Sequence, residues 1–113
     1  MNDNYFFITC YQSRDVSVLR SILFEHFKEA IESFDKNSFT FLTGHKIYTI
    51  TDYEMVVGKY AGYRPYKILT YSWRNVFKEK TNYLSDGKII ELVLETLKEL
   101  INKEKQHVDN ESK

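Results

Sequence analysis

One cysteine, three histidines and several carboxylates are the side chains that could do chemistry in this sequence. Cys10 could act as a nucleophile only as a thiolate, which needs a nearby base. The histidine nearest to it in sequence is His26, and no motif links the two. A lone cysteine in an apolar run is more often a small buried hydrophobe. We therefore predict no catalytic residue.

Metal-ligand spacing is also missing. The three histidines are His26, His45 and His107, and no two of them have the spacing of an H-x-x-x-H pair. Asp52 and Glu54 could pair for acid–base work, but residues 51–54 match the capping box of a helix, which explains both carboxylates without chemistry. The four glycines do not have the spacing of a nucleotide-binding loop. We predict no metal site and no cofactor.

Residues 59–74 (KYAGYRPYKILTYSWR) carry the strongest binding signal, with five Tyr or Trp rings, four cations and no acidic residue. Trp, Tyr and Arg dominate the hot spots of protein interfaces. If residues 66–74 form a strand, Leu69, Tyr71 and Trp73 share one face, which we expect to be core. The predicted binding surface consists of the remaining side chains and one tyrosine on a neighbouring strand: Tyr48, Tyr60, Tyr63, Arg64, Tyr66, Lys67 and Arg74.

Alternating and helical apolar patterns predict the elements that would position this surface. The segments 4–11, 39–43, 46–51 and 66–74 are expected strands, with a hairpin turn at Gly44-His45. Two long amphipathic helices are expected at about 13–34, capped by Ser13 or Asp15, and at about 85–106, capped by Ser85. A short helix at 52–60 follows the capping box, although a third hairpin strand would also suit Met55-Val56-Val57.

The predicted order is β-α-β-β-(α)-β-α, which indicates an α+β fold. We expect a two-layer sandwich, with a mostly antiparallel sheet and both long helices on one face. The apolar stripe of the first helix contains Val16, Leu19, Leu23, Phe27, Ala30, Ile31 and Phe34; that of the last helix contains Ile90, Val93, Leu94, Leu97, Leu100 and Ile101. Residues 1–106 form a single expected domain and 107–113 a frayed polar tail.

Composition excludes strong electrostatic steering by the whole chain, since sixteen basic and sixteen acidic residues cancel. The charge is uneven, however: residues 46–80 hold seven basic and three acidic groups, a formal +4. A lone cysteine and an opening Met1-Asn2-Asp3-Asn4 without signal-peptide character predict a cytoplasmic protein with no membrane partner.

Three functions follow from these observations. The first is a non-enzymatic protein-binding module, such as a small inhibitor, an adaptor or an immunity-type protein of the kind that mobile elements carry. The second is a single-stranded nucleic-acid binder that uses an aromatic, locally basic sheet face. The third is an enzyme whose site is assembled from residues scattered along the chain. A homodimer, formed by the same aromatic face, stays open as well.

Overall fold

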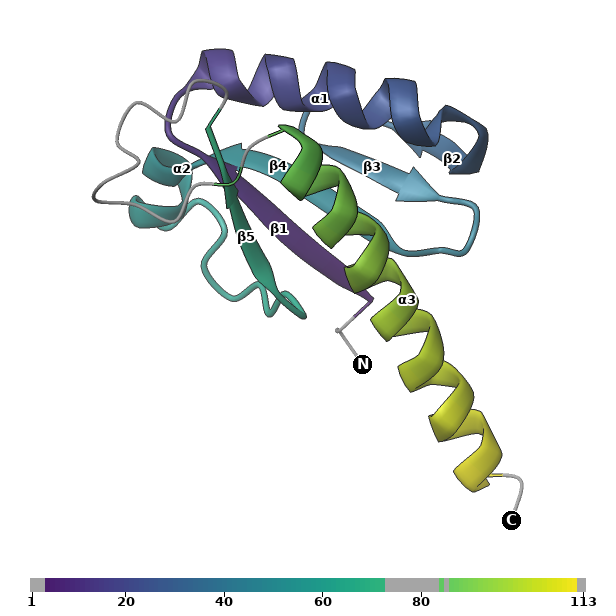
Figure 1. Cartoon of the computed structure of the whole chain (residues 1–113). Coiled ribbons are helices and arrows are strands. Elements are labelled where there is room, and N and C mark those ends of the chain that lie inside the picture. The colour runs from purple at the N-terminus through teal and green to yellow at the C-terminus, as the bar shows by residue number, and fades with distance from the viewer. Residues whose placement is uncertain (1–3, 73–83, 85, 112–113) are drawn as a thin grey trace.

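The computed structural model describes residues 4–72, 84 and 86–111. It contains five strands and three helices, with one 3-10 turn (Figure 1). In chain order these are β1 (Tyr5–Cys10), α1 (Ser13–Phe27), the turn η1 (Lys28–Ala30), β2 (Ile31–Phe34), β3 (Ser38–Phe41), β4 (Lys46–Thr51), α2 (Asp52–Val56), β5 (Ile68–Tyr71) and α3 (Asp86–Glu111). The α+β class predicted from the sequence is confirmed.

The five strands form one sheet in the order β2-β3-β4-β1-β5. Both pairings of β1, with β4 and with β5, are parallel, while β2-β3 and β3-β4 are antiparallel. The sheet is therefore mixed rather than mostly antiparallel. Tight turns join β2, β3 and β4, which requires antiparallel neighbours, whereas long connections through helices allow β1, β4 and β5 to run in parallel.

Helices α1 and α3 cover one face of the sheet and enclose its main core (Figure 1). The fully enclosed side chains of this core include Phe6, Ile8, Leu19, Leu23, Ile47, Tyr71, Ile89 and Val93. Cys10 belongs to the same core, as predicted, and burial together with Asp15 and Asp52 raises the pKa of its thiol. The Tyr71 hydroxyl donates a hydrogen bond to Asp86 at 2.5 Å and so joins β5 to the first turn of α3.

The first helix is shorter than predicted, because it ends at Phe27 and the residues up to Phe34 form η1 and the edge strand β2. As a strand, β2 places Ile31 opposite Phe41 and Phe34 opposite Phe39. These pairings between distant residues outweigh the local helical spacing. The predicted caps are also wrong, since the N-cap is Gln12, whose side chain makes no capping bond.

The capping box at the start of α2 is confirmed, and the alternative of a third hairpin strand is wrong. The Glu54 backbone N–H donates to the Thr51 hydroxyl at 3.2 Å, and the Thr51 backbone N–H donates to the Glu54 carboxylate at 2.9 Å. The helix ends at Val56, earlier than the predicted end near Tyr60.

Helix α3 is longer than predicted and continues to Glu111; its last turns project beyond the sheet (Figure 1). Its stripe also includes the fully buried Ile89, the predicted Ile90 is half-buried against the core, and the predicted core residue Leu94 is exposed. The stripe is thus shifted around the helix by part of a turn. Trp73 and the predicted cap Ser85 lie outside the described residues.

Candidate binding surface

The sheet face opposite α1 and α3 carries aromatic side chains from its two central strands. Parallel register places Phe7 beside Tyr48, and Tyr5 precedes Phe7 by two residues on the same face of β1. The ring centroids of Phe7 and Tyr48 are 5.4 Å apart, and those of Tyr5 and Tyr48 are 5.7 Å apart. Both pairs meet edge to face, an arrangement that aromatic quadrupoles favour.

The loop that follows α2 covers these rings with two further tyrosines. Gly58 and Gly62 have φ angles of +79° and +91°, which side-chain-bearing residues rarely adopt, and they allow the loop to turn back over the sheet. Tyr60 lies 5.7 Å from Phe7, and Tyr63 lies 5.5 Å from Tyr48, between ring centroids. We call the five rings the aromatic cluster: Tyr5, Phe7, Tyr48, Tyr60 and Tyr63. The part of this face that β1 and β4 form is therefore covered by the loop, whereas Ile68 of β5, beside Phe7, stays exposed.

The environment of the cluster favours the neutral form of the Tyr48 and Tyr60 hydroxyls. Burial, and then the neighbouring Tyr63, raise the pKa of Tyr48. Burial, and then the charge of Glu54, raise the pKa of Tyr60. The Tyr5 hydroxyl accepts a hydrogen bond from the Arg64 backbone N–H, which ties the covering loop to β1. Tyrosines with raised pKa values do not supply a base near neutral pH.

The structure brings together only part of the predicted binding surface. Tyr48, Tyr60 and Tyr63 meet in the aromatic cluster, and Arg64 follows directly in the covering loop. Two further predicted residues, Tyr66 and Lys67, precede β5 and bind α3 instead. Arg74 lies outside the described residues.

Tyr66 and Lys67 both bind Glu99 of α3. The Tyr66 hydroxyl and the Lys67 ammonium each lie 3.0 Å from the same carboxylate oxygen. The hydrogen bonds from Lys67 and then Tyr66 lower the pKa of Glu99, and the bond to Glu99 raises the pKa of Tyr66. These two residues therefore fasten the loop before β5 to α3 rather than adding to the aromatic cluster.

Helix α2 presents an apolar surface that sequence reasoning did not identify. Tyr53 and Val56 in the helix and Val57 directly after it are 72%, 83% and 54% exposed, and we call these three residues the α2 patch. The signal was available: the capping box sets the phase of the helix, so that Met55 turns toward the protein while Val56 and Val57 turn outward. A five-residue helix has room to bury only one side.

Both cations and carboxylates belong to this layer of the molecule or lie beside it. The Lys59 ammonium pairs with Glu54 at 3.2 Å, and the Lys46 ammonium lies 5.5 Å from the Tyr48 ring centroid. Arg64 is exposed, and within the described ranges no carboxylate forms an ion pair with its guanidinium. The layer formed by α2 and its loop thus combines exposed apolar side chains with an exposed arginine, while its formal charge over residues 52–64 is zero.

The groups considered for chemistry are dispersed. His26 is exposed, and His45 is buried between the Thr43 hydroxyl at 2.7 Å and the Glu104 carboxylate at 2.9 Å, where it joins the β3-β4 turn to α3. Across the residues that the structure describes, no three His, Cys, Asp or Glu side chains gather in a way that could hold a metal ion. No helix in the same residues is long and apolar enough to span a bilayer.

Comparison of this chain with protein-family models, with curated proteins and with solved structures finds no match.

Proposed function

We propose that this chain is a non-enzymatic module that binds another protein through the α2 patch together with Tyr63 and Arg64. The proposal keeps two residues of the surface predicted from the sequence and adds the three residues of the α2 patch. All five belong to one continuous stretch, residues 53–64, which forms the layer over the aromatic face of the sheet (Figure 1). Small inhibitors, adaptors and immunity-type proteins act through surfaces of this kind.

The observation that carries the proposal is the exposure of large apolar side chains on an element that is held in place. The capping box satisfies the first turn of α2, and hydrogen bonds from the Lys59 and Gly58 backbones close its end. The patch is therefore presented in one orientation, so little conformational entropy is lost when a partner covers it. Contiguous exposed apolar surface on a small domain is typical of an interaction site.

The charge around the patch indicates the chemistry of the partner. The Arg64 guanidinium forms no ion pair with the residues that the structure describes, and Lys59 can exchange its exposed pair with Glu54 for an intermolecular one. Arg is enriched at interfaces because its planar group binds carboxylates with two parallel hydrogen bonds. We expect a partner with an apolar groove, which receives Val56 and Tyr53, flanked by acidic side chains.

The nucleic-acid alternative loses support because the loop covers the rings of β1 and β4. Base stacking on a sheet needs ring faces that are accessible to the base, whereas Phe7 and Tyr48 pack against Tyr60 and Tyr63. The exposed residues of α2 include two valines, which offer no stacking surface. A protein partner accounts for exposed aliphatic side chains better than a single strand does.

The test begins with capture of the partner on the tagged full-length chain in the presence of nuclease, followed by purification of the complex and measurement of its affinity by titration calorimetry. We expect Val56→Asp to weaken binding at least about 100-fold, because a carboxylate would enter the apolar groove, and Arg64→Ala to weaken it about tenfold. Leu42→Asp is the matched control, since Leu42 is an exposed apolar residue in the β3-β4 turn, away from α2.

The affinity of a variant is compared with that of the wild type only if both proteins have the same midpoint of thermal unfolding, which shows that the substitution leaves the fold intact. Unchanged affinity in both Val56→Asp and Arg64→Ala would reject this surface. Recovery of nucleic acid alone, with binding that falls steeply as salt is added, would reject the proposal in favour of the nucleic-acid alternative.

A further inference from the structure

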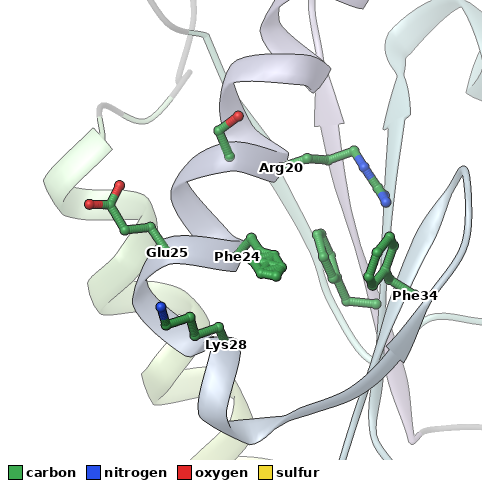
Figure 2. A pocket seen from close by; sticks show the side chains of 7 residues that line it. Arg20, Phe24, Glu25, Lys28 and Phe34 are labelled. Carbon is green, nitrogen blue, oxygen red and sulfur yellow. The ribbon is translucent and has the colours of Figure 1, made fainter.

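A second exposed apolar region lies on the opposite side of the sheet, between α1 and the edge strand β2. It is a hollow of about 450 Å³ (Figure 2). Its lining consists of Arg20, Ser21, Phe24, Glu25, Lys28, Phe34 and Phe39. Phe24 and Phe34 are 41% and 61% exposed, although their rings lie only 5.9 Å apart. Neither the proposed function nor the aromatic cluster uses this region.

The floor of the hollow is rigid. Phe39 is buried, and the Arg20 guanidinium lies 4.4 Å above its ring centroid. The same guanidinium donates to the Thr49 hydroxyl at 3.0 Å and to the Asp35 carbonyl at 2.5 Å. Arg20 therefore serves as a fixed wall between α1 and the sheet, and the shape of the hollow is set before anything binds.

Two opposite charges stand one helical turn apart on the rim. Figure 2 shows Glu25 and Lys28 on one flank of the helix and Phe34 on the other, with Phe24 between them. Both charged residues are exposed, and neither forms an ion pair with any residue that the structure describes. Three residues along a helix span about 4.5 Å, so the two charges form a short pattern of negative and then positive.

This pattern is complementary to itself. A two-fold axis that runs beside α1 and at right angles to it, level with the midpoint between Glu25 and Lys28, places the helices of two copies side by side and antiparallel. Glu25 of each copy then faces Lys28 of the other, and the flanks that carry Phe34 also meet. Two ion pairs and one shared apolar centre result from a single rotation. A net charge of zero leaves no long-range repulsion between the copies.

The edge of β2 is unsuited to binding by strand addition. Its register shifts between Ile31 and Ser33, and the exposed Glu32 lies at this irregularity. Bulges and charged residues on edge strands prevent pairing with further strands. A partner at this face must therefore bind through side chains, as an antiparallel pair of α1 helices would.

We propose that the face formed by α1 and β2 binds a second copy of this chain, with Phe24 and Phe34 of both copies at its centre and two Glu25–Lys28 ion pairs at its rim. Because the apolar area is small compared with that of permanent dimers, the association is weak and depends on concentration. It uses a different face from the α2 patch, so a dimer leaves both α2 patches accessible and presents them to partners in pairs.

Sedimentation equilibrium of the full chain, from about 1 µM to about 1 mM, tests the proposal. Glu25→Lys alone and Lys28→Glu alone should each weaken self-association about tenfold or more, because like charges then face each other twice. An equimolar mixture of these two variants should associate again as a heterodimer, since every charge then faces its opposite. The double variant should also regain self-association.

A matched control is available on α3, where Lys88 and Glu91 have the same spacing but pair within the chain at 3.0 Å. Exchanging these two charges should leave self-association unchanged. A wild-type chain that stays monomeric over the whole range would overturn the proposal, as would a mixture of the two single variants that fails to associate. Val56→Asp should not change self-association, which separates this test from that of the proposed function.

Discussion

The two faces of the inner strand β1 are packed in different ways. On the side of α1 and α3, Phe6 and Ile8 are fully enclosed by aliphatic side chains from two long helices. On the other side, Tyr5 and Phe7 meet other aromatic rings from a strand and a loop, and the covering Tyr63 is still 44% exposed. The first face forms the main core, whereas the second face is less completely buried and leaves part of its aromatic surface accessible.

This contrast shows how a small domain can be stable and still expose apolar residues. A long helix buries a continuous apolar stripe against the sheet, whereas the five-residue helix α2 and its loop cover the other face only thinly. Aromatic rings suit a thin cover because each one buries a large area with few rotatable bonds. Four sets of substitutions test the difference between the helix side and the aromatic side.

The largest effect is expected on the helix side. Leu23→Ala removes a fully buried side chain of α1 and should lower the free energy of unfolding by about 3 kcal/mol, because the core around it cannot close the cavity. Urea denaturation followed by circular dichroism measures the change. A loss below about 1 kcal/mol would mean that this core adapts easily, and the contrast between the two faces would fail.

A smaller effect is expected on the aromatic side. Tyr60→Ala should lower the free energy of unfolding by about 1–2 kcal/mol, because Tyr60 is half-buried and its ring makes edge-to-face contacts with Phe7 and Tyr48. Tyr60→Phe is the control and should remain close to wild type, because the ring contacts persist. If Tyr60→Ala destabilises the protein as much as Leu23→Ala does, the aromatic cluster is a second core of equal weight.

The capping box should contribute about 1 kcal/mol. Thr51→Ala removes the hydroxyl that accepts from the Glu54 N–H, and it should lower the free energy of unfolding by that amount. Amide hydrogen exchange should also become faster in α2 than in α1, because the loss is local. Equal acceleration in both helices would show that α2 does not open independently of the core.

The smallest effect is expected at Glu99 and depends on pH. The pKa of Glu99 is lowered in the folded protein by Lys67 and Tyr66, so its contribution to stability is present above the unfolded pKa of about 4.3 and disappears as the pH falls through the folded value. Glu99→Gln should therefore be less stable than wild type near pH 6, with the difference vanishing at strongly acidic pH.

Thermal unfolding at a series of pH values measures this difference. Tyr66→Phe, which removes one of the two donors to Glu99, should give an intermediate profile. Because Glu99 is only partly shielded from water, the effect remains small. A difference between Glu99→Gln and wild type that grows toward acidic pH would contradict the assignment.

The candidate site was predictable in part. The excess of Tyr and Arg in residues 59–74 pointed to the covering loop, and Tyr48, Tyr60 and Tyr63 do meet. Tyr5 and Phe7 were missed as their partners, although the run from Tyr5 to Cys10 is apolar at every position but Thr9, as expected of a strand buried on both faces. Composition identified the rings, but it could not indicate which strand they cover.

The sequence by itself determined the features that depend on neighbouring residues. The capping box at Thr51 and Glu54, the turn at Gly44, the core stripe of α1 up to Leu23 and the burial of Cys10 all follow from spacing within one element. Each is set by interactions over a few residues, and the tertiary structure leaves these local preferences unchanged.

Only the tertiary structure decided the features that depend on distant segments. Residues 31–34 have helical spacing, yet they form a strand because Phe34 and Phe39 meet across a turn. The parallel register of β1 with β4 and β5 and the folding of Tyr60 over Phe7 have the same origin. The burial of apolar area stabilises the strand pairing that completes the core. The spacing of residues within one segment does not identify the segment with which it pairs.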